Sequence, residues 1–168
     1  ALPRPRLLYV GAIHERLNTD TIREISEGLP KASIVVVGPI LSPEVVKKLQ
    51  PLANVHIHDP LPHAEVGGLI HGADVCLMPH HRNALTESMS PLKVYEYCAT
   101  GRPVVATDLA PVRTVHGMVR LVAEGASFAD AIRKALNDGP MPEDDRQAFL
   151  MRNSWQGRHE QILDLALG

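Results

Sequence analysis

Short apolar stretches recur along the chain, and each is followed by a segment whose apolar residues return with the period of a helix. Six of these stretches have the length and the β-branched content of strands. Most are apolar throughout rather than alternating, which indicates strands covered on both faces, as in a parallel sheet. The predicted strands are residues 7–13, 33–38, 54–58, 73–79, 102–108 and 118–123.

The segments between these strands carry the start and stop signals of helices. Ser42 precedes Pro43 and Glu44, the arrangement of an N-cap, a proline in first position and an acidic first turn. The predicted helices are residues 18–28, one that starts at Ser42, 64–71, 91–100, 127–137, 143–152 and 154–167. Because parallel neighbours need a crossover connection, this alternation predicts a doubly wound α/β sheet.

The composition fits a single domain over residues 1–168, in which we expect residues 142–168 to form a helical tail carrying Trp155. A chain of this length buries roughly 70% of the surface that it exposes when unfolded. The formal net charge of -2 argues against a nucleic-acid partner, which needs a basic surface. Residues 1–6 are rich in Pro and Arg, so we expect a linker there and a chain cut from a longer protein.

The two cysteines, Cys76 and Cys98, lie in apolar segments and form no CxxC pair. This usage fits a reducing compartment, and we expect a cytoplasmic protein. No apolar run approaches the roughly 20 residues that span a bilayer.

Ligands of a doubly wound sheet bind beyond the carboxyl ends of its strands, so the residues after each strand are candidates. Gly11 to Arg16 follow the first strand. Residues 79–91 follow the fourth and form a long polar stretch, which is usually functional in a compact domain. That stretch brings Ser90 to the start of a helix, whose unpaired N–H groups favour an anion.

Lys93 lies in the first turn of the same helix, where a cation opposes the helix dipole. It is either solvated or binds a phosphate together with the helix end, by hydrogen bonds worth roughly 1.5–3 kcal/mol each. Glu96 follows three residues later, on nearly the same face. Its carboxylate could accept two hydroxyl hydrogens, as a ribose diol offers, or pair with Lys93.

Three stretches carry a resemblance to a known family. They are YVGAIHERLN over residues 9–18, residues 73–108 with the specific core SPLKVYEYCATGRPVVATD, and NSW over residues 153–155. Together they resemble the C-terminal, donor-binding domain of GT-B glycosyltransferases, of the GT4-like group (glycosyl transferases group 1). The resemblance covers essentially the whole chain and implies a Rossmann-like doubly wound parallel sheet of about six strands with flanking helices.

The resemblance also implies a ligand and a chemistry. A nucleotide-diphosphate sugar would lie at the carboxyl ends of the strands, and its sugar would be transferred with retention, without a metal ion or other cofactor. Arg16 matches the family's basic residue after the first strand, which meets the diphosphate, and Lys93 lies where the phosphate-binding helix begins. Fixed cations there would stabilise the departing diphosphate, so both are the candidate catalytic residues. Glu96 matches the family's ribose-binding glutamate.

The resemblance implies that four further residues contact the substrate. Gly11 would let the backbone approach the ligand, and Ser90 would present the helix end to the diphosphate. Leu61 and Pro62 fall in the segment that commonly contacts the base.

The chain departs from the family at one position. Ser88 stands eight residues before Glu96, where the family has the first glutamate of its EX7E pattern, which meets the donor sugar. The nearest carboxylate, Glu87, comes one position early, and we do not assign it a catalytic role. Asn83, Thr86 or backbone amides of the loop are the candidates for that contact.

Metal and other catalytic sites find little support. His56 and His58 flank one residue and His80 and His81 are adjacent, yet no third ligand stands at zinc-like spacing. Most of these histidines are therefore expected to be structural or solvated, although His80 or His81 could touch substrate. GxSxG, GxGxxG and Walker A sequences are absent.

The resemblance leaves the first half of a GT-B enzyme unaccounted for. We expect this N-terminal domain to be a partner in the same protein, and the isolated chain to bind the nucleotide sugar weakly with little transfer. Cell-surface polysaccharide or glycolipid synthesis and peripheral membrane association follow from similar bacterial proteins. Two alternatives stay open, a nucleotide-sugar 2-epimerase-like enzyme and a non-catalytic nucleotide-sugar-binding module.

Overall fold

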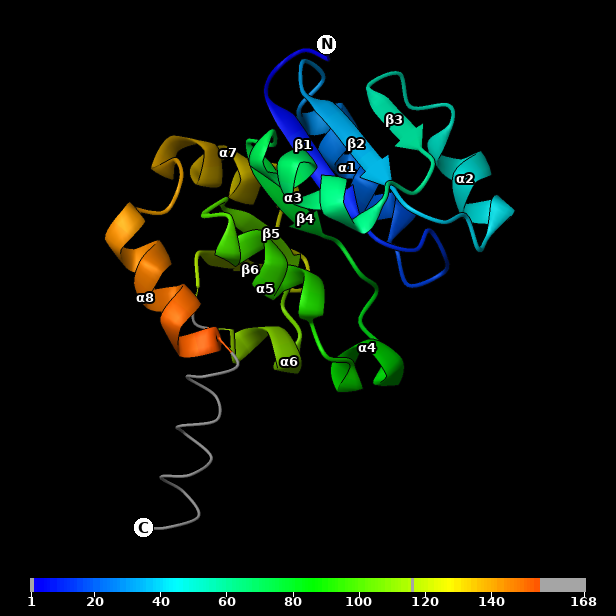
Figure 1. The fold of residues 1–168 in the computed structure, drawn as a ribbon. Helices are drawn as coiled ribbons and strands as arrows, with labels where there is room; N and C mark the ends of the chain where they lie inside the picture. Colours follow the sequence, from blue (N-terminus) through cyan, green and yellow to red (C-terminus); the bar gives the residue numbers. More distant parts are fainter. Residues whose placement is uncertain (1, 116, 155–168) are drawn as a thin grey trace.

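The structure, a computed structural model, describes residues 2–115 and 117–154. Its centre is a six-stranded sheet in the order β3-β2-β1-β4-β5-β6, in which all neighbouring strands are parallel (Figure 1). The predicted doubly wound sheet is thereby confirmed. The strands are β1 Arg6–Val10, β2 Ser33–Val37, β3 Val55–His58, β4 Val75–Met78, β5 Val104–Thr107 and β6 Val119–Val122.

The first strand is shorter than its apolar run suggests. It was predicted over residues 7–13 but ends at Val10, because Gly11 takes a φ of 145° that breaks the extended backbone. Ile13 still reaches the core, where it is fully buried, and its N–H donates to the Pro39 carbonyl. The apolar run therefore continues the core beyond the end of the strand.

Eight helices are described: α1 Thr19–Gly28, α2 Pro43–Leu49, α3 His63–His71, α4 Ala84–Ser88, α5 Leu92–Ala99, α6 Ala110–Arg113, α7 Phe128–Asp138 and α8 Glu143–Asn153. The prediction of a continuous loop over residues 79–91 is wrong, because Asn83 and Thr86 form a capping box that starts α4. The short helix α6 was not predicted; Pro111 stands in its first turn. Ser42 precedes α2 as predicted, but its side chain forms no capping hydrogen bond.

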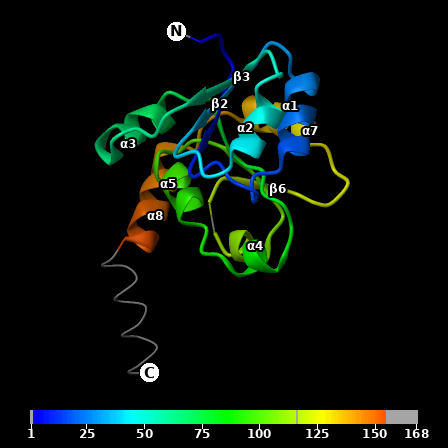
Figure 2. The ribbon, with the colours of Figure 1, turned by 90° about the vertical axis from the view of Figure 1, so that its right-hand side faces the viewer.

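Helices cover both faces of the sheet, which explains why the strands are apolar throughout (Figure 2). Leu7, Val36 and Leu77 belong to a core beneath α1, α2 and α7. Leu8 and Cys76, one position along their strands, belong to a second core beneath α3, α5 and α8. The two-residue period of each strand thus divides its side chains between two cores.

The described part of residues 142–168 packs on the domain. Phe149 of α8 is buried, and its ring lies 6.3 Å from that of Tyr95 on α5. The helix predicted over residues 154–167, with Trp155, lies outside the described residues except for Ser154, which follows α8. None of the described helices is long and apolar enough to cross a bilayer.

The strand order creates one crevice. The chain moves outward from β1 through β2 to β3, and from β4 in the opposite direction through β5 to β6. β1 and β4 are therefore adjacent while the loops that follow them diverge, which is where doubly wound sheets bind their ligands.

Candidate functional site

A cavity of about 180 Å³ opens at the carboxyl ends of β1 and β4. Its walls come from the loop after β1, from the segment between β4 and α5, and from α6 with the residue before it. The described residues that line it are Arg16, Met78, His80, Thr86, Met89, Ser90, Pro91, Leu92, Lys93, Leu109, Pro111 and Val112. We call it the cation cavity, because these residues include Arg16 and Lys93 but no carboxylate.

The ammonium group of Lys93 is buried and has no hydrogen-bond partner in the part of the chain that is described. Its Nζ lies 4.1 Å from the centroid of the Tyr9 ring, which offers only a cation–π contact. The pKa of Lys93 is lowered to about 7, mainly by burial and to a smaller extent by repulsion from Arg16. Attraction by Glu96 opposes this shift. A buried cation that has no hydrogen-bonded counter-ion is costly, so the arrangement favours binding of an anion.

Arg16 supplies the second positive charge. Its Nη1 lies 3.5 Å from Sδ of Met89, and its Nε is buried without a partner among the described residues. The N-terminus of α5 adds backbone N–H groups beside the two cations. These groups were predicted to form one site, and in the structure they line one cavity.

Gly11 makes room for this arrangement. A Cβ atom at residue 11 would lie 2.5 Å from Nζ of Lys93, and the φ of 145° disfavours any other residue. Gly38, with a φ of 150°, lets its own loop approach equally closely, since a Cβ there would lie 2.2 Å from the Gly11 carbonyl oxygen. The structure thus shows Gly11 beside the lysine that the ligand would meet.

Tyr9 belongs to the site but was not assigned to it by the sequence, whereas His80 was expected there as one of two histidines that could touch substrate. The Tyr9 hydroxyl donates to the Ala12 carbonyl at 3.1 Å and lies 3.4 Å from Nε2 of His80. Burial raises the pKa of Tyr9 to about 12. Burial, with the nearby Lys93 and Arg16, lowers the pKa of His80 to about 3. Both side chains are therefore neutral at physiological pH, and a tyrosine inside an apolar strand gives no signal that distinguishes it from a core residue.

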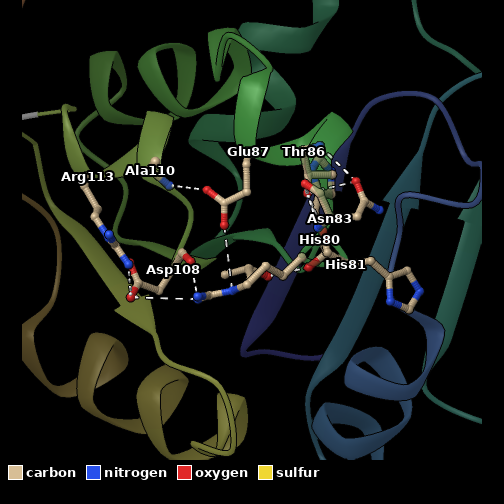
Figure 3. Close-up of polar contacts among 10 residues, drawn as sticks. His80, His81, Asn83, Thr86, Glu87, Asp108, Ala110 and Arg113 are labelled. Carbon is tan, nitrogen blue, oxygen red and sulfur yellow. Dashed lines mark hydrogen bonds and ion pairs between the residues drawn. The ribbon is translucent and has the colours of Figure 1, made fainter.

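The segment after β4 holds the Arg16 loop through its backbone. His81 N–H donates to the Arg16 carbonyl at 2.8 Å, and Asn18 N–H donates to the Pro79 carbonyl at 2.8 Å. The Thr86 hydroxyl donates to the His81 carbonyl at 2.6 Å and fixes this segment in turn (Figure 3). Thr86, a predicted substrate contact, is buried and is used for structure, although it also lines the cation cavity.

Asn83 is occupied in the same way. Its side-chain oxygen accepts from the Thr86 N–H at 3.0 Å, while the Asn83 N–H donates to the Thr86 hydroxyl at 3.0 Å. Asn83 does not line the cation cavity among the residues described.

Glu87 links α4 to the start of α6, two elements that contribute residues to the cavity lining (Figure 3). Its Oε2 accepts from the Ala110 N–H at 2.8 Å, and its Oε1 lies 3.9 Å from Nε of Arg82. Arg82 also donates to the backbone carbonyl of Asp108. Arg113 binds the Asp108 carboxylate through Nε and Nη2 at 2.6 and 2.9 Å, which lowers the pKa of Asp108. These four side chains, Arg82, Glu87, Asp108 and Arg113, form what we call the strap.

Three predicted contacts lie away from the cation cavity. Leu61 is 39% exposed and follows β3, and Pro62 precedes α3. Glu96 lies on the exposed side of α5, close enough to Lys93 to influence its pKa. The cavity lining therefore unites Arg16, Thr86, Ser90 and Lys93. It includes neither these three residues nor the predicted contacts Gly11 and Asn83. Among the described residues, no group of His, Cys, Asp and Glu could hold a metal ion, and His56 and His58 form none.

Fold and site together define a doubly wound domain with a cavity lined by two cationic residues at its switch point. Residues 4–138 match the family described as Glycosyl transferases group 1, and the chain belongs to this family.

Individual relatives agree with the family. A Bacillus subtilis (strain 168) protein named "Putative teichuronic acid biosynthesis glycosyltransferase TuaH" is 30% identical over 103 residues, which are 60% of this chain and 26% of that protein. Among solved structures, Anabaena Alr3699/HepE in complex with UDP and glucose has a TM-score of 0.72 at 15% identity, covering 96% of this chain and 48% of its own. AviGT4, a glycosyltransferase involved in avilamycin A biosynthesis, has a TM-score of 0.69 at 19% identity, and the match covers 88% of this chain and 46% of AviGT4.

These structural likenesses show that the fold is that of GT-B glycosyltransferases. The chain spans about a quarter of the length of the curated relative and less than half the length of the solved ones.

Proposed function

We propose that this chain is the C-terminal half of a GT-B glycosyltransferase and binds its donor, a nucleotide-diphosphate sugar, with the diphosphate in the cation cavity. The observation that carries the proposal is the pair of buried groups, Nε of Arg16 and Nζ of Lys93, on two residues that line one cavity; neither group has a hydrogen-bond partner among the described residues. A diphosphate would supply the missing negative charge.

The same groups suit the chemistry of glycosyl transfer. As the bond between the sugar C1 and the diphosphate oxygen breaks, negative charge grows on the leaving diphosphate. Arg16, Lys93 and the first N–H groups of α5 are already in place to stabilise that charge. Preorganised cations of this kind make a metal ion unnecessary, and we include metal independence and retention of configuration in the proposal.

The family relatives support the identity of donor and product. A solved structure of similar fold contains UDP and glucose, which favours a uridine nucleotide. The names of TuaH and of WaaG, a glycosyltransferase of lipopolysaccharide biosynthesis with a TM-score of 0.62, favour a cell-surface polysaccharide or glycolipid as product. A glycolipid acceptor would bring the full-length protein to the inner face of the membrane, and the acceptor would bind an N-terminal half.

Calorimetric titration of the folded chain with UDP-, GDP- and dTDP-glucose tests donor binding. We expect binding of at least one of them, weakened about tenfold or more in Arg16→Ala, since charge-assisted hydrogen bonds contribute roughly 1.5–3 kcal/mol each. Arg133→Ala is the matched control, because that arginine pairs with Asp130 on the exposed face of α7. A folded sample that binds no nucleotide sugar would contradict the proposal.

Two other functions are separated by a second assay. The full-length protein, incubated with its nucleotide sugar and no acceptor, would release an epimerised sugar or free nucleotide if it were a 2-epimerase. A non-catalytic module would bind the donor and yield no product with any acceptor.

A further inference from the structure

The hydroxyl of Tyr97 lies at the point where β1 and β4 separate. β1 stays paired with β2 as far as Val10, but its pairing with β4 ends at Leu8. At Val10 the Tyr97 hydroxyl takes over, because it accepts from the Val10 N–H at 2.8 Å and donates to the Val10 carbonyl at 3.4 Å. A side chain from α5 thus satisfies the strand end that β4 has left.

The hydroxyl is not needed to fill this space. Tyr97 is fully buried, in the same core as Leu8 of β1 and Cys76 of β4. Burial raises the pKa of Tyr97 well above its ordinary value, so the hydroxyl keeps its proton and serves as both donor and acceptor. A phenylalanine would pack in the same way but would offer neither bond to the backbone.

Lys93 and Tyr97 act on neighbouring residues of β1 and its turn. They are four residues apart on α5, a spacing that puts both on one face of the helix. Tyr97 bonds Val10, and Nζ of Lys93 lies only 2.5 Å from where a Cβ atom at residue 11 would be. Because Val10 and Gly11 are consecutive, the Tyr97 bonds fix the Gly11 turn relative to α5, and with it the position of the ammonium group.

Little else holds the Lys93 ammonium group in place. Its Nζ has no hydrogen-bond partner among the described residues, and the Tyr9 ring offers only a cation–π contact. A lysine has a flexible four-carbon stem, and a buried ammonium gains free energy by reaching water. The close approach of α5 to the end of β1 therefore keeps this cation buried.

We propose that Tyr97 is a positioning residue of the donor site, whose hydroxyl holds α5 against the end of β1 and thereby keeps the Lys93 ammonium group in the cation cavity. The inference rests on the proposed function, because the diphosphate is what this ammonium group would meet. Tyr97 is not among the described residues that line the cation cavity, so it acts through Lys93.

Calorimetric titration with pyrophosphate compares the wild-type chain with Tyr97→Phe. Ser33→Ala is the matched control, because the buried Ser33 hydroxyl also bonds the backbone, at the Pro3 carbonyl, but at the amino end of β2. Thermal unfolding confirms that each protein is folded. We expect Tyr97→Phe to weaken binding about fivefold or more and Ser33→Ala to stay within about twofold of the wild type.

The pH profile of the same titration separates positioning from stability. Wild-type affinity should fall above about pH 7, where Lys93 loses its proton. In Tyr97→Phe the released ammonium group reaches water and holds its proton longer, so the fall should move up by about one pH unit or more. Ionisation of pyrophosphate is common to all three proteins and cancels in the comparison. The other ionisable side chains beside Lys93 are also unchanged: Arg16, Glu96, Tyr9 and His80.

Hydrogen exchange of the wild type gives a second measurement that needs no variant. Binding and the Tyr97 bonds would stabilise each other, since coupling between two sites is reciprocal. Saturating pyrophosphate should therefore slow exchange of the Val10 amide by about threefold or more beyond its effect on Val36, in the middle of β2.

Three results would overturn the inference. Folded Tyr97→Phe could bind pyrophosphate as the wild type does, or bind it more weakly with an unchanged pH profile, which is the result of a purely structural role. If Tyr97→Phe does not fold, equal slowing at Val10 and Val36 in the wild type would be the third. A folded wild type that binds no pyrophosphate is a different result, since it contradicts the proposed function itself.

Discussion

The ammonium group of Lys93 lies 4.1 Å from the centre of the Tyr9 ring, held there by the turn that Gly11 allows. Tyr9 comes from β1 and Lys93 from the start of α5, so the contact joins the two sides of the switch point. The ring supports a cation but cannot neutralise it. The ammonium group is thereby kept in place without a hydrogen-bond partner among the described residues.

This arrangement predicts that donor affinity falls as the pH rises above about 7. The unliganded amine, whose pKa is lowered to about 7, loses its proton there, and binding of a diphosphate must restore it. His80, with a pKa of about 3, and Tyr9, with about 12, do not titrate in this range. Titration with UDP-glucose between about pH 6 and pH 9, in buffers of different ionisation enthalpy, measures the proton uptake. A pH-independent affinity would show that Lys93 is not in the binding site.

Lys93→Met should stabilise the unliganded chain while weakening donor binding. The pKa of Lys93 in the folded chain lies below its unfolded value of 10.5. Between about pH 7 and 10.5 the unfolded chain therefore binds more protons than the folded one. The destabilisation caused by burying the protonated amine is then complete below about pH 7. Removing the amine should raise the free energy of unfolding at pH 7 by on the order of 1–3 kcal/mol. Thermal unfolding with and without UDP-glucose measures both effects. A destabilised variant would mean that the ammonium is satisfied within the protein.

Glu87 should prove to be a structural residue. Glu87→Gln keeps an acceptor for the Ala110 N–H and loses only an exposed, 3.9 Å ion pair, so stability and donor affinity should change little. Glu87→Ala removes the acceptor and should cost about 1 kcal/mol of unfolding free energy, with donor affinity reduced severalfold because the strap links both cavity walls. Near-complete loss of transfer in Glu87→Gln at unchanged affinity would instead assign the carboxylate to the donor sugar.

Donor binding should not require a divalent cation. Arg16 and Lys93 already provide the positive charge that Mg²⁺ supplies in metal-dependent phosphate sites. We expect UDP-glucose affinity to change by less than about twofold between EDTA and millimolar Mg²⁺. An affinity about tenfold higher with Mg²⁺ would show that donor binding depends on a divalent cation.

The fold and Lys93 followed from local signals in the sequence, and Arg16 followed from its place after the first strand together with the family resemblance. Apolar runs covered on both faces give the sheet, and Arg16 and Lys93 each stand directly beyond a strand or at a helix start. Parallel sheets bring such positions to one edge, so their meeting could be predicted without coordinates.

The rest of the site was missed for two reasons: a local helix-capping pattern was not used, and other contacts join segments that are distant in the sequence. Asn83 and Thr86 looked like free polar groups, but in the structure they satisfy one another. In the sequence His80 looks like any other histidine that follows a strand. Only the structure shows that it lines two cavities. A second cavity, of about 610 Å³, lies beyond β5 and β6. It combines groups from α1, α7 and the loop after β6, which are far apart in the sequence.

Titration with pyrophosphate isolates the role of Arg16 and Lys93, since this ligand carries neither a base nor a sugar. Calorimetry would compare the wild type, Arg16→Ala, Lys93→Met, the double variant and Arg133→Ala, with thermal unfolding to confirm that each is folded. We predict that either single substitution weakens binding about tenfold or more, that the double variant shows none, and that Arg133→Ala equals the wild type. Wild-type affinity in folded Arg16→Ala and Lys93→Met would contradict the claim that these two cations hold the diphosphate.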